Sequence, residues 1–238
     1  VVGAGPAGLQ TAIRLKELGV DVSVFEEHES IGVPEHCTGL ISRKGVEELG
    51  LHLGDSLQNT IKGAKIFSPS GNMIKVKTKE PVAYVVSRKE FDSILLRKAR
   101  LIGVHVSTET KLIDVRNNTL FIQNQKRGEL RKADIVVGAD GVNSTVRHLI
   151  GIKTNKEDFI HTIQTTCTGE FNPDFVEVHL LDYTKGFFST NAQIEAPYAF
   201  TTPPHLPHPF SPDLPSLHSL VVAKSAFCQS YQCHCQRN

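Results

Sequence analysis

Three glycines near the start of the chain have the spacing of a phosphate-binding turn. The sequence opens VVGAGPAGLQ, so Gly3, Gly5 and Gly8 form a G-x-G-x-x-G pattern. The first glycine permits a tight turn, the second lets the backbone approach a pyrophosphate, and the third lets a helix pack closely on a strand. Glu26 follows at close to the separation of about 20 residues at which an acid binds a ribose hydroxyl pair. These residues predict dinucleotide binding, and the acid favours a free ribose over a 2′-phosphate.

Periodicity predicts the elements that would position this turn. Pro6 suits the first turn of a helix, where a missing N–H loses nothing. Apolar residues at helical spacing then continue to Gly19, a typical helix end. Residues 20–24 alternate valines as a buried strand does, and they lead to Glu26. The pattern predicts a β-α-β unit. The alternative is a glycine-rich turn without a ligand, and this stretch does not decide between FAD and NAD.

A second apolar stretch also ends in an acid at a glycine turn. Residues 133–141 read ADIVVGADG, which predicts a buried strand, and residues 143–149 begin a helix. Asp140 can accept backbone N–H groups there or orient Arg147, and the helix N-terminus suits an anion. The pattern D-G-x-x-S-x-x-R is far more particular than G-x-G-x-x-G alone, which makes Asp140 a candidate site residue.

Four further residues are candidates because of where they fall. Cys37 and Thr38 lie in the loop-like stretch 28–40. Cys37 is either a small, half-buried loop residue or lies where the chain passes the reactive ring of a cofactor held by the glycine turn. His36 is either a solvated loop residue or an acid or base. Arg88 opens a predicted helix, where it either reaches an anionic cofactor group or is a solvated surface arginine.

The remaining predicted elements are two helices and a series of short strands. The helices are residues 42–49, with Ser42 as the N-cap, and residues 87–103. The apolar face of the longer helix is predicted to hold Phe91, Ile94, Leu95, Lys98 and Leu101. Antiparallel strands are inserted between the parallel ones, with a hairpin in residues 61–86 and a small meander in residues 111–132. The predicted strands are residues 64–67, 73–76, 82–86, 104–107, 111–115, 119–123, 129–132, 159–171 and 175–181.

Composition excludes several classes of protein. The 238 residues have a net charge of +1, which argues against a nucleic-acid partner and against a polybasic membrane surface. No run of apolar residues approaches the 18 or so that a membrane span needs. Five scattered cysteines fit a reducing, cytoplasmic compartment. The chain opens inside the first predicted strand without a signal peptide, so we expect a few preceding residues to be missing.

The composition changes near residue 187. The text TTPPHLPHPFSPDLPSLHS has no helix or strand period and many X-Pro steps, so residues 189–238 are predicted to be an irregular tail that is not part of the fold. Four residues of this tail could bind a metal: Cys228, Cys233, His234 and Cys235. Their spacing matches no structural zinc pattern, and we predict no metal site. Residues 1–155 are predicted to form a cofactor-binding domain and residues 156–188 the start of a substrate-binding sheet.

Several of these motifs together resemble a known superfamily. GAGPAG with Glu26, the R-x-x-F-D-x-x-L pattern that begins at Arg88, and VVGADGVNSTVR are similar to the flavoprotein monooxygenase (p-hydroxybenzoate hydroxylase-like) superfamily. Within it, IGVPEHCTGLIS and LLDYTKGFF resemble the geranylgeranyl reductase family, and most closely the archaeal digeranylgeranylglycerophospholipid reductases. The resemblance covers residues 1–188. It implies an α/β fold with a Rossmann-like FAD-binding domain of the p-hydroxybenzoate hydroxylase type, inserted antiparallel strands and an incomplete substrate domain.

The resemblance also implies roles for individual residues. FAD would lie with its pyrophosphate at the glycine turn, in backbone contact with Ala7, and with its ribose at Glu26. Cys37 and Thr38 would lie along the flavin, and Cys37 would be the residue near the reacting centre. Leu112 would offer backbone groups near the adenine. The other cofactor-binding residues would be Gly3, Gly5, Gly8, Arg88 and Asp140.

The function implied is reduction of the C=C bonds of geranylgeranyl chains in isoprenoid membrane lipids. The partners would be an isoprenoid lipid, a reductant such as NAD(P)H or another electron donor, and a membrane surface reached through the substrate. The chain has no Trp, and the later G-D-A motif of the superfamily does not occur in it. Two alternatives therefore stay open: an FAD-dependent aromatic monooxygenase, and a truncated fragment without catalytic activity.

Overall fold

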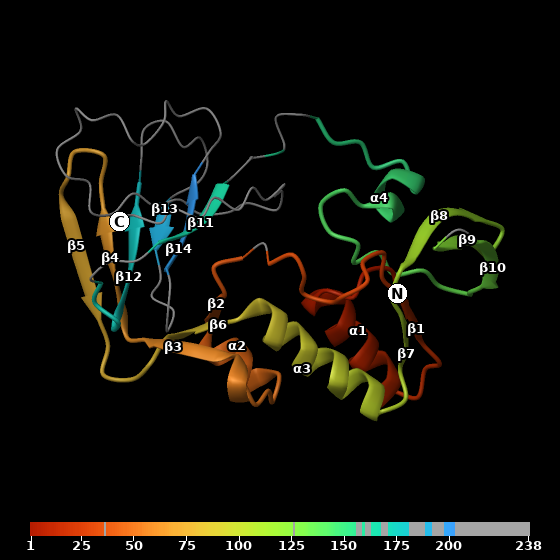
Figure 1. Ribbon diagram of the computed structural model, residues 1–238, viewed down its shortest axis with the longest axis horizontal. Helices are drawn as coiled ribbons and strands as arrows, with labels where there is room; N and C mark the ends of the chain where they lie inside the picture. The colour runs from red at the N-terminus through yellow and green to blue at the C-terminus, as the bar shows by residue number, and fades with distance from the viewer. Residues whose placement is uncertain are drawn as a thin grey trace. The chain divides into compact units, whose positions relative to one another are not determined.

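A computed structural model describes residues 1–35, 37–125, 127–155, 159, 163–167, 171–180, 189–191 and 198–202 (Figure 1). The chain divides into two compact units. The first unit comprises Val1–Glu35 and Lys89–Asp158, and the second unit comprises His36–Arg88 and Phe159–Asn238. Residues 36–88 of the second unit are thus an insertion between the two parts of the first unit.

The first unit is built on a small parallel sheet. Strands β1 (Ser23–Phe25) and β7 (His105–Ser107) pair in parallel, with Val24 opposite Val106. Val2 forms parallel bridges to Phe25 on one side and to Gly138 on the other. The order across the sheet is therefore Gly138, Val2, β1 and β7, and helix α1 (Pro6–Glu17) connects the two middle positions. This arrangement confirms the predicted β-α-β unit.

Helix α1 begins and ends where its sequence predicts. Pro6 occupies the first helical position after Gly5, and Gly19 has a φ of +82°, a backbone conformation that favours glycine. The strand that follows is shorter than predicted, because the Val20 N–H still donates to the carbonyl of Leu15 in the last helical turn. Val20 is accordingly 44% exposed, whereas the side chain of Val24 is fully buried.

Helix α3 (Arg88–Leu101) confirms the second long predicted helix, and Phe91 and Leu95 of its predicted apolar face are buried. Its buried residues are Phe91, Asp92, Leu95 and Ala99, which recur at the three- and four-residue spacing of one helix face. Leu101 was predicted on that face and is 85% exposed. The prediction for Leu101 was wrong because Leu101 lies six positions after Leu95. Six helical steps of about 100° turn its side chain away from the buried stripe.

A three-stranded antiparallel meander completes the core of the first unit. It comprises β8 (Thr110–Arg116), β9 (Thr119–Asn124) and β10 (Arg127–Lys132), in the order β10-β9-β8. Asn117 and Asn118 join β8 to β9 with φ angles of 46° and 60°, the left-handed pair that a two-residue type I′ hairpin requires. Inward-facing residues of the meander pack against the parallel sheet in one cluster of Val2, Leu112, Leu120 and Ile122.

The segment that leads to Asp140 is not the buried strand that was predicted. It pairs along one side only, where the Val2 N–H donates to the Val137 carbonyl at 2.9 Å and the Ala139 N–H donates to the Val2 carbonyl at 2.8 Å. Within the described residues no strand flanks its other side, and Ile135 is 80% exposed. An apolar run therefore lies at a sheet edge, where burial depends on what covers the edge rather than on the run itself. Helix α4 (Thr145–Leu149) follows it.

The second unit contains a three-stranded antiparallel sheet in the order β2-β6-β3. Its strands are β2 (Leu40–Ser42), β6 (Ala83–Val86) and β3 (Leu57–Ile61). Helix α2 (Arg43–Glu48) begins after Ser42, whose hydroxyl accepts the Gly45 N–H as the predicted N-cap, and a 3₁₀ turn (Gly54–Ser56) precedes β3. Strands β2 and β3 were missed, because three residues are too few to show alternation and LQNTI is largely polar.

A second sheet of this unit has the order β13-β12-β4-β5 (Figure 1). The predicted hairpin is confirmed, with Ile66 of β4 (Gly63–Phe67) opposite Ile74 of β5 (Met73–Lys77). Strand β12 (Phe175–His179) pairs in parallel with β4 and brings Val176 into a buried cluster with Ile61 and Val85. Strand β13 (Ser189–Asn191) pairs with β12, and β11 (Ile163–Cys167) pairs with β14 (Tyr198–Thr202).

Strands β13 and β14 fall in the stretch predicted to be an irregular tail. The rest of that stretch lies outside the described residues, as do the four tail residues weighed as metal ligands. The predicted domain boundaries thus remain a prediction. No helix among the described residues is both long and apolar enough to cross a membrane.

Candidate dinucleotide-binding site

Two glycines of the turn are required by the backbone around them. Gly3 has a φ of +96°, and a Cβ there would lie 2.4 Å from the Ala139 carbonyl oxygen. A Cβ on Gly8 would lie 1.9 Å from the Gly3 carbonyl oxygen and 3.2 Å from the Cβ of Ala139. The first turn of α1 can approach the strands this closely only because both positions lack a side chain. Gly3 and Gly8 thus have the steric roles predicted for them.

Gly5 is different, because none of the described residues requires a glycine there. Its φ of −70° is open to any residue, and a Cβ there would meet no atom within 4 Å. Gly5 is the N-cap of α1 and makes no side-chain cap, and the exposed Ala7 follows in the first helical turn. The N–H groups of a first turn have no intrahelical partners and carry the positive end of the helix dipole. Gly5 therefore leaves open space in front of amides that suit a pyrophosphate.

The carboxylate of Glu26 lies against this turn. Glu26 is only 9% exposed, and its Oε2 accepts the N–H of Ala4 at 2.8 Å. Its Oε1 accepts the N–H of His28 at 2.9 Å and lies 2.6 Å from Nδ1 of the same histidine. The acid predicted to bind a ribose is thus tied to the glycine turn. Each carboxylate oxygen has two lone pairs, so three donors leave one acceptor position, on Oε2, for a further hydroxyl group.

The meander holds the loop that carries Glu26. The Thr110 N–H donates to the Glu26 carbonyl at 2.7 Å, and the Glu109 N–H donates to the His28 carbonyl at 3.0 Å. Lys111 Nζ lies 2.6 Å from a carboxylate oxygen of Glu27. The start of β8 and the residue before it therefore hold the backbone at Glu26 and at His28.

Leu112 follows in the same strand, with its side chain 2% exposed in the core. Its backbone pairs with Ile122, next to a bulge before Asp114. The buried side chain leaves only the backbone of Leu112 for contact with a cofactor. The predicted adenine contact remains a prediction.

Asp140 organises the turn before α4. Its Oδ1 accepts the Ser144 hydroxyl at 2.6 Å, and its Oδ2 accepts the Val146 N–H at 3.0 Å. Ser144 in turn caps the helix by accepting the Arg147 N–H at 2.9 Å, and the Arg147 guanidinium donates to the Val142 carbonyl. The predicted acceptance of a backbone N–H is confirmed. The backbone of Asp140 also passes close to Gly3, since a Cβ on Gly3 would lie 2.9 Å from the Asp140 Cα.

The first unit thus brings six predicted residues around one turn. Gly3, Gly5, Ala7 and Gly8 form the turn, and Glu26 and Asp140 lie beside it. Sequence reasoning missed two contributors, Ala4 and His28. Ala4 acts through its backbone, which leaves no signal in residue type. The pattern E-x-H at the end of β1 could have indicated His28, because a residue two positions after a strand-terminal acid can turn back onto it.

Three other predicted residues, Cys37, Thr38 and Arg88, belong to the second unit. Gly39 has a φ of +76°, and a Cβ there would lie 1.9 Å from the Val86 carbonyl oxygen. The Val86 N–H donates to the Gly39 carbonyl at 3.0 Å, which holds the stretch containing Cys37 and Thr38 beside the strand that leads into Arg88. Cys37 is a half-buried thiol that forms no disulfide. His36 lies outside the described residues.

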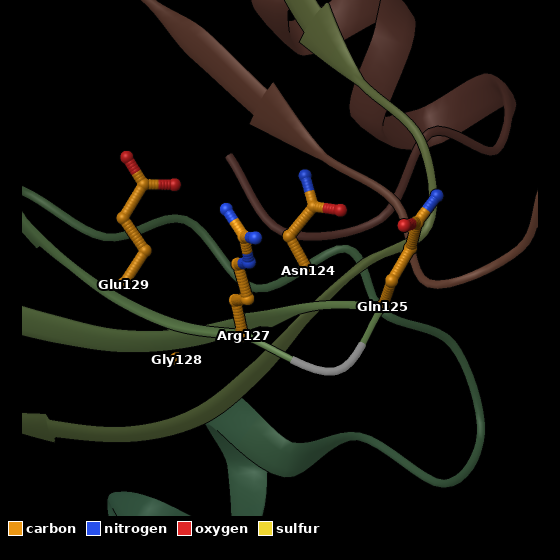
Figure 2. A pocket seen from close by; sticks show the side chains of 5 residues that line it. All are labelled: Asn124, Gln125, Arg127, Gly128 and Glu129. Carbon is orange, nitrogen blue, oxygen red and sulfur yellow. The ribbon is translucent and has the colours of Figure 1, made fainter.

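A separate surface pocket lies at the turn between β9 and β10 (Figure 2). In Figure 2 the side chains of Asn124, Arg127 and Glu129 project to the same side of the hairpin. None of the predicted site residues lines it; the lining residues are Asn124, Gln125, Arg127, Gly128 and Glu129. Among the described residues, no group of three or more His, Cys, Asp or Glu side chains is placed to hold a metal ion.

Comparisons with known proteins agree with this geometry. Residues 1–192 match the family model described as an FAD binding domain. A digeranylgeranylglycerophospholipid reductase of Methanococcus vannielii is 30% identical over 187 residues, which cover 76% of this chain and 46% of the relative. This chain therefore spans about half the length of the curated relatives it matches.

Solved structures show the same fold. A geranylgeranyl bacteriochlorophyll reductase-like protein of Thermoplasma acidophilum matches with a TM-score of 0.75 and 21% identity, over 84% of this chain and 54% of the other. A 2-methyl-3-hydroxypyridine-5-carboxylic acid oxygenase matches with a TM-score of 0.66 and 23% identity, over 87% and 58%. The fold is therefore α/β and of the p-hydroxybenzoate hydroxylase type, as predicted.

The residues present fit an adenine dinucleotide. The open space at Gly5 faces the N-terminus of a 12-residue helix, and the nearly buried acid lies beside the same turn. The family match extends through both of these features. The chain therefore belongs to the FAD binding domain family, a family of flavin-dependent oxidoreductases, and FAD is its cofactor.

Proposed function

We propose that this chain is the FAD-binding part of a reductase that saturates C=C bonds in the geranylgeranyl chains of isoprenoid membrane lipids. The observation that carries the proposal is the set of relatives at about 30% identity that are named digeranylgeranylglycerophospholipid reductase. The segment with Cys37 and Thr38, which resembles that family, supports it. The structural neighbours support the fold alone, because their identities to this chain are below 25%.

The residues of this chain would bind and orient the cofactor. The first-turn amides of α1 would hold the pyrophosphate where Gly5 leaves space, and the Glu26 carboxylate would accept a ribose hydroxyl. Arg88 would pair with an anionic part of the cofactor, and the backbone of Leu112 would contact the adenine. Asp140 would keep the turn before α4 in place through its hydrogen bonds to Ser144 and Val146.

Bound FAD, once reduced, supplies hydride transfer to an alkene carbon, and the protein supplies orientation and a dry apolar surface. Cys37 would lie near the reacting centre, where its thiol can hold a proton. The electron donor would be NAD(P)H or another reductant. The lipid substrate would bring the protein to a membrane surface.

The test is reduction of a geranylgeranyl phospholipid by the FAD-loaded chain under argon, with product saturation measured by mass spectrometry. With dithionite as the electron source, we expect the mass of the lipid to increase by about 2 Da for each double bond reduced. Saturation without oxygen would exclude an oxygen-dependent hydroxylase. FAD retention without any saturation would contradict the reductase assignment for this chain, and failure to retain FAD would contradict the cofactor site itself.

A further inference from the structure

The charged group at the candidate ribose site has one partner that the proposed function does not use. The carboxylate of Glu26 is nearly buried, and a buried charge must be compensated by donors. Two of its donors are backbone N–H groups, those of Ala4 and His28. The third is the imidazole of His28, whose Nδ1 lies 2.6 Å from Oε1. This is the only one of the three that a substitution can remove without moving the backbone.

The carboxylate beside the imidazole decides which of its ring nitrogens carries a hydrogen. An ionised carboxylate only accepts hydrogen bonds, so Nδ1 must carry the hydrogen that lies between the two atoms. The ring itself is 56% exposed, whereas the Glu26 side chain is 11% exposed. Its backbone is held in turn by the Glu109 N–H, which donates to the His28 carbonyl.

We infer that His28 is a positioning residue for the cofactor, acting through Glu26. Its Nδ1–H donates to Oε1 and fixes the plane of the carboxylate, so the lone pair that remains on Oε2 is held in place before a ribose arrives. Preorganisation of this kind strengthens binding because the ligand does not have to order the group itself. The inference rests on the assignment of Glu26 to the ribose under the proposed function.

Four substitutions test the inference through FAD affinity, measured by quenching of flavin fluorescence. His28→Ala should raise the Kd about tenfold, the usual effect of losing one hydrogen bond to a charged group. His28→Asn should restore affinity to within about threefold, because the Asn amide nitrogen occupies the position of Nδ1. His28→Gln, whose amide falls at the position of Nε2, should bind as weakly as His28→Ala. His105→Ala is the matched control, since His105 is an exposed histidine of the same unit that contacts Ser107 and not Glu26.

A double variant separates positioning from direct contact. If His28 acts through Glu26, Glu26→Ala/His28→Ala should bind FAD no more weakly than Glu26→Ala alone. His28→Ala should lower the unfolding temperature of the cofactor-free protein by only about 2–4 °C for each kcal/mol lost, so the variant stays folded during the titration. Additive losses in the double variant, or equal losses in His28→Asn and His28→Ala, would overturn the inference.

The same series distinguishes the inference from its premise. Unchanged affinity in His28→Ala together with a large loss in Glu26→Ala would refute the role of His28 and leave the ribose assignment standing. Unchanged affinity in Glu26→Ala would refute the ribose assignment, and the role of His28 with it.

Discussion

At the scale of single residues, the glycines of the turn have two different reasons to be glycine. A Cβ on Gly8 would lie 1.9 Å from a backbone oxygen, whereas a Cβ on Gly5 would meet nothing within 4 Å. We expect Gly8→Ala to destabilise the cofactor-free protein by about 2 kcal/mol, because the backbone must move. Gly5→Ala should change that stability by less than about 1 kcal/mol. It should instead weaken FAD binding at least tenfold, since the new methyl group occupies the space left for the pyrophosphate.

Denaturant unfolding without FAD and a fluorescence titration with FAD measure the two effects separately. The pair serves as its own control, because both substitutions add one methyl group to the same turn. Full FAD affinity in Gly5→Ala would show that the space in front of α1 is not used by the pyrophosphate.

Asp140 has the structural role that its position before α4 predicted. It accepts both the Ser144 hydroxyl and the Val146 N–H. Asp140→Ala leaves these donors without an acceptor and should cost about 1–3 kcal/mol. Asp140→Asn retains one acceptor oxygen and should cost less. Hydrogen exchange should locate the loss at the amides of α4, and unchanged protection there in Asp140→Ala would contradict the capping role.

At the scale of elements, the β8–β9 turn is the clearest case of backbone conformation choosing the residue. Asn118 has a φ of 60°, which glycine adopts freely and β-branched residues do not. We expect Asn118→Gly to leave stability unchanged or raise it by up to about 1 kcal/mol. Asn118→Val should lower it by about 1–2 kcal/mol. Chemical denaturation measures both variants, and a neutral valine would mean that the turn relaxes to another type.

The β4–β12 pair contains a histidine whose surroundings favour its neutral form. His179 stacks on Phe67, with ring centroids 4.5 Å apart, and burial lowers its pKa more than the neighbouring Glu177 raises it. Because the folded pKa lies below the unfolded value of about 6.5, the unfolded state takes up the proton first. The stability contributed by the neutral ring is therefore present above about pH 6.5 and is lost as the pH falls.

His179→Phe keeps an aromatic ring in the stack and removes the titration. The unfolding free energy of this variant should fall less than that of the unchanged chain between about pH 7 and about pH 5. The same fall in His179→Phe as in the unchanged chain would place the titrating group elsewhere.

At the scale of the whole molecule, long periodic segments could be predicted and their surroundings could not. Helix α1 with its glycine stop, helix α3, the β4–β5 hairpin and the meander all follow local patterns that one stretch of sequence contains. The predicted burial of Ile135 and Leu101 was wrong, because burial depends on which other segments cover a sheet edge or a helix face. The partners of Glu26 were missed for a similar reason: a backbone N–H from Ala4 is available at any residue type, and only the fold selects it.

FAD binding should reveal which part of the molecule the cofactor holds. A ligand that binds only the folded state stabilises it by about 2.7 kcal/mol at one hundred times its Kd. Amides in the first turn of α1 and in residues 26–28 should gain hydrogen-exchange protection beyond this global effect, because the ligand would contact them directly. The Asn117–Asn118 turn, at the opposite end of β8 from the residue that binds the Glu26 carbonyl, should gain only the global share. Equal gains in protection at both ends of β8 would show that FAD stabilises the unit without lying on the glycine turn. Glu26→Ala should bind FAD only weakly and should therefore show neither the local nor the global gain in protection.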